Sequence, residues 1–384
     1  MKELIIPFGK PIIDKREILA VKKVLKSGIY VHGKKSLEFE KKFSNYTNAK
    51  YSISVSSCTA GMHLLYFSLG IGNGDEVIVP AQTHVATAHA VELVGAKPIF
   101  VDCEKSTGNI DVEKIEANIT NKTKAITVVH FLGIPVEMSK IKILAKKYKL
   151  EIIEDCALSL GAKYKNIHTG LLGTAGVFSF YPVKHITTAE GGMIITNSKN
   201  LYKKLTINKA LGIDKNYSER RISGFYDAIN LGFNYRMSEI HAAIGIEQLK
   251  KFKYFFKKRK FNFNFLSNSL KKINNVRILE SNSLNCKSSY YCLNIVLEKK
   301  LKHKRKLIIN FLKKNKIGFS IYYPQPVPRM KYYKKKYNFI KKKFINASNI
   351  SDFSISIPVG PHINKVELRK IVKKYYYILN KFNK

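Results

Sequence analysis

Hydrophobic residues in the first two thirds of the chain follow two alternating spacings. Short runs rich in Val and Ile are typical of buried strands, whereas apolar positions three or four residues apart indicate helices with one buried face. Runs of the first kind lie at residues 76–80, 98–102, 125–130, 150–155 and 191–196, and helical spacing covers 15–26, 37–46, 83–94, 112–117 and 137–148. This alternation predicts an α/β fold with a mostly parallel sheet covered by helices on both faces.

The pattern changes near residue 250. A helix that begins near Ser238 continues through residues 250–270 as a basic, Phe-rich segment, which we interpret as the connection to a second domain. Strand-like spacing then occurs at 290–296 and 317–323, and helical spacing at 303–315 and 364–380. We therefore expect a large domain in residues 1–250 and a small C-terminal α+β domain in residues 251–384.

The charge of the chain is unevenly distributed. Its 384 residues carry a formal net charge of +41, and residues 250–384 hold 35 Lys and Arg against 4 Asp and Glu. Lys is much more frequent than Arg, and no helix-turn-helix, zinc-finger or RNA-binding motif is present, so specific nucleic-acid binding is not expected. Binding of nucleic acid or another anion by the basic third stays open as an alternative.

Cysteine usage and the absence of long apolar runs favour a cytoplasmic protein. No run approaches the roughly 18 apolar residues of a membrane helix, and the first residues lack the apolar core of a signal peptide. The five cysteines form no CxxC pair and no Cys/His metal spacing. We interpret them as free thiols of a reducing compartment and expect no metal site.

The first candidate for chemistry is Lys184, within residues 176–192. It follows an aromatic run and Pro182, where a predicted strand ends and the chain turns. A lysine held against aromatic side chains is partly desolvated, which favours the neutral amine that attacks carbonyl groups. The common alternative, in a chain so rich in lysine, is a solvated surface residue.

Two other strand ends carry polar residues. Residues 56–59 lie between a short strand and a helix, where hydroxyl groups act either as ordinary caps or as part of an anion site at the helix N-terminus. Glu154 and Asp155 close an apolar strand, and because side chains alternate we expect one of the two to point inward and to need a partner. The alternative is a carboxylate that caps the following turn.

Together these features suit one cofactor, pyridoxal 5'-phosphate. In parallel sheets, ligands bind beyond the carboxyl ends of the strands, where all three features are expected. A helix N-terminus would anchor the phosphate, a carboxylate would keep the pyridine nitrogen protonated, and a lysine would bind the aldehyde and move a proton.

The chain resembles the DegT/DnrJ/EryC1/StrS family, the sugar aminotransferases among the fold-type-I pyridoxal-phosphate enzymes, nearly from end to end. The segments that carry the resemblance are SSCTAGMHL (56–64), PAQTHVATAHAVELVGAKPIFVD (80–102), EDCALSLGA (154–162), FSFYPVKHITTAEGGMI (178–194) and GFNYRMSEIHAAIGIEQL (232–249). The resemblance implies the fold-type-I architecture, with a large cofactor-binding domain and a small α+β domain.

The resemblance also implies roles for particular residues. Lys184 would form the Schiff base with the cofactor and act as acid and base in the proton shift. Asp155 would pair with the pyridine nitrogen, and Ser179, Cys58 and Thr59 would hold the phosphate.

Four further positions are notable in this comparison. His84 stands where the family stacks an aromatic ring on the pyridine. Asn234 would reach the cofactor phosphate of the neighbouring subunit, which implies a homodimer with shared active sites. Arg236 belongs to the same motif, and its role is left open between substrate contact and structure. Leu158 is a departure, because the family often has Gln, Glu or His there.

The activity implied is transfer of an amino group from an amino acid, with glutamate as the expected donor, to the keto group of a nucleotide-linked sugar. Such a reaction would serve the synthesis of surface polysaccharide or glycoconjugate precursors. Family members that act as dehydratases replace the lysine by His, so Lys184 favours the aminotransferase. Amination of a cyclitol or other carbocyclic ketone, and a regulator that keeps the lysine, remain alternatives.

Overall fold

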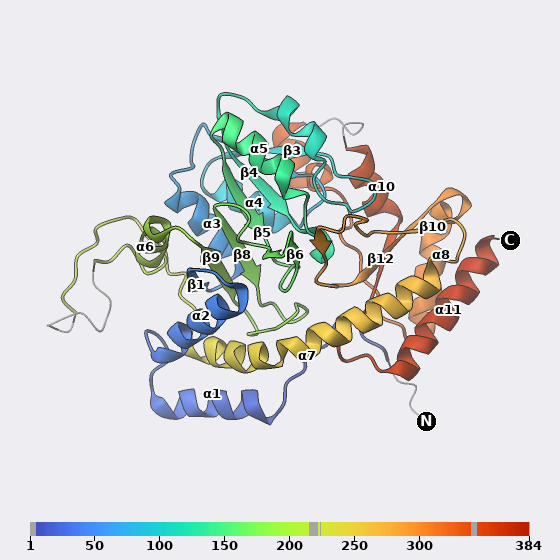
Figure 1. The fold of residues 1–384 in the computed structure, drawn as a ribbon, viewed down its shortest axis with the longest axis horizontal. Coiled ribbons are helices and arrows are strands. Elements are labelled where there is room, and N and C mark those ends of the chain that lie inside the picture. Colours follow the sequence, from blue (N-terminus) through green and yellow to red (C-terminus); the bar gives the residue numbers. More distant parts are fainter. Residues whose placement is uncertain (1–4, 215–221, 223, 339–343, 384) are drawn as a thin grey trace.

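The computed structural model describes residues 5–214, 222, 224–338 and 344–383 (Figure 1). Its helices are α1 (Lys15–Ser27), α2 (Lys34–Thr47), α3 (Cys58–Ser68), α4 (Val85–Leu93), α5 (Met138–Tyr148), α6 (Lys199–Asn208), α7 (Glu239–Leu270), α8 (Arg305–Lys314), α9 (Lys331–Tyr337), α10 (Ile345–Phe353) and α11 (Lys365–Asn383). Its strands are β1 (Tyr51–Val55), β2 (Glu76–Pro80), β3 (Lys97–Val101), β4 (Thr123–Val129), β5 (Glu151–Asp155), β6 (Lys163–Tyr164), β7 (Ile167–His168), β8 (Ala175–Ser179), β9 (Gly192–Thr196), β10 (Val276–Ile278), β11 (Cys286–Lys287), β12 (Leu293–Leu297) and β13 (Ser354–Ile357).

A seven-stranded sheet organises the larger part of the molecule. Its strand order is β1-β9-β8-β5-β4-β2-β3. β9 is antiparallel to both of its neighbours, and the other strands run parallel to one another. The predicted α/β fold with a mostly parallel sheet is therefore confirmed, and the carboxyl ends of β2, β4, β5 and β8 share one edge.

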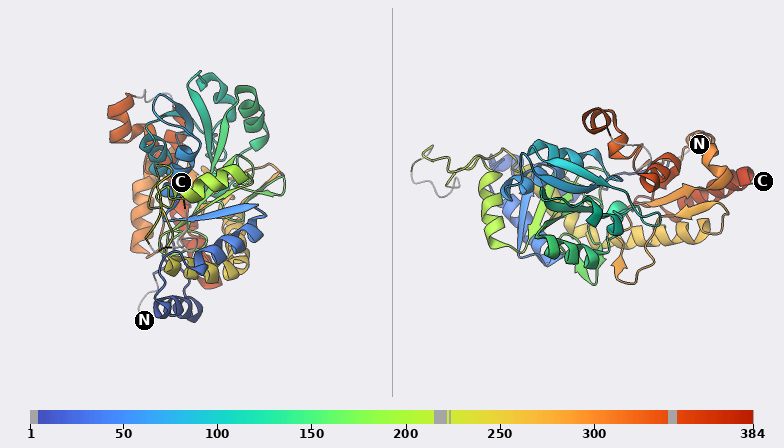
Figure 2. Two further views of the ribbon diagram at one scale, coloured as in Figure 1. Left: turned by 90° about the vertical axis from the view of Figure 1, so that its left-hand side faces the viewer. Right: turned by 90° about the horizontal axis from the view of Figure 1, so that it is seen from above.

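Helices cover both faces of this sheet because its strands are apolar on both sides. Val177 packs with α3, α4 and α6 on one face, whereas its neighbour Phe178 packs with α2 and α7 on the other. On the same face as Phe178, Ile78 of β2 packs against α5. The resulting three layers are visible in Figures 1 and 2.

A second core lies around the antiparallel sheet β10-β12-β13, with α8 and α11 packed against it. Helix α7 reaches both cores, since Phe252 belongs to the first and Leu270 to the second, and the helix runs unbroken past residue 250 (Figure 1). Ile6, near the N-terminus, is also buried in the second core. The division into domains at residue 250 stays a prediction.

Several local predictions need correction. The strand predicted at 317–323 is wrong, because this segment pairs only at isolated bridges, Ile317 with Ile6 and Ser320 with Ser356. β13, which the sequence reading missed, fills the sheet position beside β12 instead. The helix predicted at 112–117 consists of two short 3-10 turns. Among the described residues, no helix is long and apolar enough to cross a bilayer.

Candidate active site

A cavity of about 280 Å³ lies at the edge of the main sheet where the parallel strands end. Its walls come from the start of α3, the loop before α4, the ends of β4, β5 and β8, and a tyrosine of the C-terminal part. The lining residues are Ser57, Cys58, Thr59, Met62, Thr83, His84, Ala86, Val129, Asp155, Ala157, Leu158, Ser179, Tyr181, Lys184, Glu190 and Tyr323. All the predicted site residues except Asn234 therefore meet at one cavity.

Lys184 lies in the turn after β8, held by a hydrogen bond from its backbone N–H to the Tyr181 carbonyl at 2.9 Å. Its Nζ lies 5.7 Å from the centre of the Tyr291 ring. Burial lowers the pKa of the Lys184 ammonium below its ordinary value, while Cys58 and the charge of Asp155 act in the opposite direction. A lowered pKa increases the fraction of neutral amine, the form that attacks a carbonyl carbon.

Asp155 ends β5 and is almost fully buried. Its Oδ1 accepts the Ala157 N–H at 3.0 Å, and its Oδ2 accepts the Thr87 hydroxyl at 2.8 Å. Both predictions for this carboxylate, an inward position and a bond to the following turn, therefore hold at once.

The expectation that only one of the two acidic residues points inward is wrong, because Glu154 is buried as well. Its carboxylate accepts the N–H groups of Gly170, Leu172 and Gly173 and also bonds His130. His130, Glu154 and Cys156 lie close enough for a metal ion. The hydrogen bonds to Glu154 already use its two oxygens, so the cluster acts as a structural anchor for this loop.

The start of α3 provides the hydrogen-bond donors at the other end of the cavity. The Ser57 hydroxyl caps the helix by accepting the Ala60 N–H at 3.0 Å, which leaves the first-turn N–H groups of Cys58 and Thr59 available to a ligand. A Cβ at Gly192 would lie 2.7 Å from the Cys58 nitrogen, so glycine lets this helix start approach β9. The structure shows the cap, and the anion site stays a prediction.

His84 is the N-cap of α4, and its Nδ1 accepts the Ala86 N–H at 3.2 Å. The helix thus begins two residues later than predicted. Burial, and then the charge of Lys184, lowers the pKa of His84, so the ring is neutral with its proton on Nε2. Its ring packs edge-on against Tyr323, with centroids 5.4 Å apart. The apolar Leu158 side chain lines the same cavity.

A family model with the description "DegT/DnrJ/EryC1/StrS aminotransferase family" matches residues 11–375. The chain belongs to this family. An uncharacterized protein of Methanocaldococcus jannaschii, MJ1066, is 37% identical over 377 residues, which is 97% of each chain.

Solved structures of aminotransferases superpose over nearly the whole chain. Helicobacter pylori PseC, an aminotransferase involved in the biosynthesis of pseudoaminic acid, is 29% identical with a TM-score of 0.92 and covers 99% of this chain and 100% of its own. The pyridoxal-phosphate form of Spr1654, a putative sugar aminotransferase from Streptococcus pneumoniae, is 28% identical with a TM-score of 0.92 and the same coverage. The predicted fold-type-I architecture is confirmed.

This DegT/DnrJ/EryC1/StrS protein is a pyridoxal-phosphate-dependent aminotransferase. The donor set of the cavity fits the cofactor: free N–H groups and hydroxyls suit a phosphate, Asp155 suits a protonated ring nitrogen, and Lys184 suits an aldehyde. No metal ligand is needed for this chemistry.

Asn234 lies outside the cavity of its own chain. It is exposed, and its backbone pairs with Ala210. The neighbouring Phe233 and Tyr235 rings pack on His63, whose Nδ1 lies 2.9 Å from the Tyr235 hydroxyl. The predicted reach of Asn234 into a partner's site stays a prediction.

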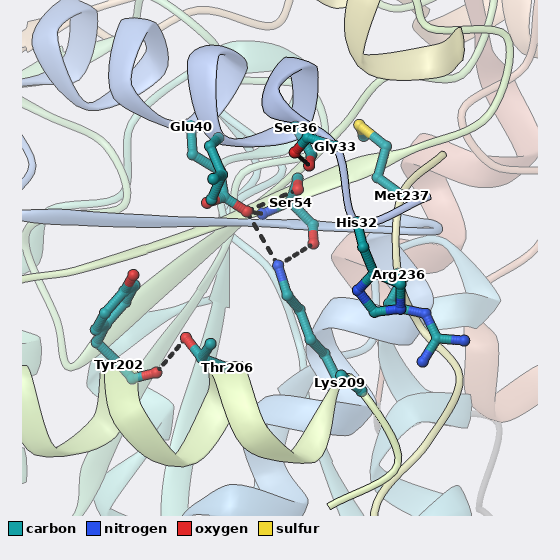
Figure 3. Close-up of a pocket in the computed structure, with 12 residues that line it drawn as sticks. His32, Gly33, Ser36, Glu40, Ser54, Tyr202, Thr206, Lys209, Arg236 and Met237 are labelled. Carbon is teal, nitrogen blue, oxygen red and sulfur yellow. Dashed lines mark hydrogen bonds and ion pairs between the residues drawn. The ribbon is translucent and has the colours of Figure 1, made fainter. Parts of the chain in front are cut away.

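Arg236 lines a different cavity, of about 210 Å³, between α2, β1 and α6 (Figure 3). In that cavity Lys209 bonds the Glu40 carboxylate at 3.0 Å and the Ser54 carbonyl at 3.1 Å. The Arg236 guanidinium points away from this ion pair, and its Nε is buried without a hydrogen-bond partner among the described residues. Arg236 therefore does not line the Lys184 cavity of its own chain.

The sequence reading did not single out Thr83 and Tyr323, which line the cavity, or Thr87, which bonds Asp155. Thr83 lies just before α4 and Thr87 in its first turn, and their hydroxyl oxygens are 2.7 Å apart. Tyr323 comes from the segment read as a strand, and only the folded chain brings it to the cavity. Thr87 lies in the family-like segment 80–102 and Tyr323 in a further family-like segment, YYPQPVPRMKYY (322–333), but no local pattern pointed to either residue.

Proposed function

We propose that this aminotransferase moves an amino group from glutamate to the keto group of a nucleotide-linked sugar, for the synthesis of polysaccharide or glycoconjugate precursors. The observation that carries the proposal is the single cavity that Lys184, Asp155 and the start of α3 share. The coarser part, an aminotransferase for sugar ketones, is supported by the sugar aminotransferases among the structural relatives. The proposal goes further in naming a nucleotide-linked substrate and glutamate as the amino donor.

Each site residue has its own role in the proposed reaction. The start of α3, with Cys58 and Thr59, and the Ser179 hydroxyl hold the phosphate, and Asp155 holds the proton of the ring nitrogen. The bound cofactor supplies an electron sink for the carbon that gains or loses the amino group. The buried Lys184 amine would act as the acid and base of the proton shift.

We also propose a homodimer in which Asn234 reaches the partner's phosphate site. Large apolar side chains on the segment after α6 are exposed, with 68% of Phe225 and 72% of Leu231 accessible. The described residues of this segment project from the body of the protein (Figure 2). A groove along α1, lined by Ile18 and Leu25, is apolar as well. Exposed apolar surface of this extent is typical of an interface.

The cytoplasm is the compartment we propose. Cys58, Cys103, Cys156, Cys286 and Cys292 are all free thiols, as in proteins of reducing compartments.

Absorption spectroscopy tests the proposed role of Lys184. The wild-type protein with pyridoxal phosphate should show a visible band that Lys184→Ala lacks, and turnover should fall by roughly a thousandfold or more. Lys253→Ala, which removes an exposed lysine of α7, is the matched control and should retain both. A wild-type protein that binds no cofactor would refute the proposed function.

A panel of substrates tests the nucleotide-linked sugar and the glutamate donor. Nucleotide-linked keto-sugars and inosose-type cyclic ketones are offered as acceptors, and ¹⁵N-labelled glutamate, glutamine and alanine as donors. Faster ¹⁵N transfer from glutamate to a nucleotide keto-sugar is expected. A preference for the cyclic ketones would replace the sugar assignment with the carbocyclic one, and an enzyme that binds cofactor without turning over any ketone would indicate a regulator.

A further inference from the structure

Two threonines connect the cavity wall to the buried face of Asp155. Thr83 and Thr87 are both almost fully buried, and their hydroxyl oxygens lie 2.7 Å apart. Thr87 also lies 2.8 Å from Asp155 Oδ2. Thr83, at the other end of this chain of bonds, lines the Lys184 cavity.

The direction of these bonds follows from the number of protons. A hydroxyl has a single proton, and an ionised carboxylate can only accept, so Thr87 donates its proton to Asp155. Thr83 must then donate its proton to Thr87. Hydrogen bonds that run in one direction polarise one another, so the bond from Thr83 strengthens the bond from Thr87 to the carboxylate.

The start of α4 fixes the position of Thr87. The His84 side chain caps this helix, and the His84 carbonyl accepts the Thr87 N–H at 3.1 Å. The Ala157 N–H binds the other carboxylate oxygen at 3.0 Å. With one donor on each oxygen, the plane of the Asp155 carboxylate is set from two sides.

We propose that Thr83 and Thr87 form a directed hydroxyl relay that orients the Asp155 carboxylate toward the ring nitrogen of the cofactor, with Thr87 as the positioning residue. This inference rests on the proposed role of Asp155. It adds two residues to which no role was assigned.

The experiment compares variants that differ in a single hydroxyl. Thr87→Val removes the proton donor at nearly constant volume, Thr87→Ser keeps it, and Thr83→Val removes only the first bond of the relay. Thr47→Val is the matched control, because Thr47 is a buried threonine far from the cavity whose hydroxyl bonds the Phe43 carbonyl at 2.9 Å. The readouts are the dissociation constant of pyridoxal phosphate, the pH midpoint of its visible band, and the melting temperature of the cofactor-free protein.

Loss of a hydrogen bond to a charged acceptor should weaken cofactor binding about tenfold or more in Thr87→Val. The pH midpoint of the band should rise, because a less firmly protonated ring nitrogen withdraws less electron density. Thr83→Val should weaken binding about threefold, consistent with a polarising role. Thr87→Ser should restore wild-type values, and Thr47→Val should change only the melting temperature.

Wild-type affinity and pH midpoint in Thr87→Val would overturn the relay while leaving the proposed function intact. Failure of the wild-type protein to bind the cofactor would instead overturn the proposed function. If Thr87→Val does not fold, Thr83→Val decides the matter, and an unchanged affinity and pH midpoint in that variant would overturn the relay.

Discussion

Replacing Glu154 by Gln should destabilise the fold more than most single substitutions. Oε1 of this buried carboxylate accepts the N–H groups of Leu172 and Gly173 at 2.7 Å each. Oε2 accepts the Gly170 N–H at 2.7 Å and lies 2.9 Å from His130 Nε2. His130 Nδ1 accepts the Val136 N–H, so the neutral ring carries its proton on Nε2 and donates to Glu154.

Glutamine can present an oxygen to one pair of donors but only an NH₂ group to the other. Two buried donors then lose their acceptor, and each costs about 1–3 kcal/mol, or roughly 2–6 kcal/mol in total. A change of tautomer at His130 does not help, because the proton would then face the Val136 N–H. The loss is a large part of the roughly 5–15 kcal/mol that stabilises a typical folded domain.

Urea denaturation followed by far-ultraviolet circular dichroism measures this loss, since the chain contains no tryptophan. Glu151→Gln on the same strand is the matched control. Glu151 is only partly buried and bonds the rotatable Thr174 hydroxyl, so its loss should stay below about 1 kcal/mol. If Glu154→Gln costs no more than Glu151→Gln, the assignment of four donors to this carboxylate is wrong.

Three further predictions follow from other groups. Burial lowers the pKa of His168 to about 4, so stability should decline as the pH falls from about 6.5 toward 4, by at most about 3 kcal/mol, and urea denaturation of His168→Gln should lack that part of the decline. Mixing the inactive variants Lys184→Ala and Asn234→Ala should restore about a quarter of the wild-type activity, because half of the randomly paired dimers have one intact site, whereas unshared sites would give none. Desolvation raises the pKa of the Cys58 thiol, which is partly exposed at the cavity, so thiol reagents at pH 8 should label it at least about tenfold more slowly in the folded than in the unfolded protein, and equal rates would contradict the raised pKa.

Local apolar patterns were sufficient for the strands of the main sheet, because β2, β4 and β5 are largely buried and each has neighbouring apolar, mostly β-branched residues. Strand predictions failed where pairing between distant segments decides which residues form a strand. Residues 317–323 have strand-like composition, but the place beside β12 is taken by β13, in which Ser354 and Ser356 are buried although serine is usually exposed. The sequence between residues 300 and 360 does not reveal that choice.

The basic surface follows from ordinary helix amphipathicity. In α11 the buried positions are apolar or aromatic, including Leu368, Ile371 and Tyr375, while Arg369 and Lys373 are exposed. Charge of this kind lies on solvated faces around the second core, and the cavity residues themselves include a single lysine and no arginine. Any attraction of an anionic nucleotide sugar would therefore act as long-range steering, which salt screens.

The sequence predicts a neutral amine at Lys184, but the structure gives a partly different cause for it. The sequence argument attributed its desolvation to the preceding aromatic run. Phe178 and Phe180 instead pack with α2 on the far side of the sheet, and of the rings in that run only Tyr181 lines the cavity. The aromatic rings that are near Lys184 include Tyr291 and Tyr323, more than a hundred residues later in the chain. The lysine chemistry therefore depends on the C-terminal part closing over the strand ends, so a change that loosens this contact should raise the pKa of Lys184 without touching any residue of the motif.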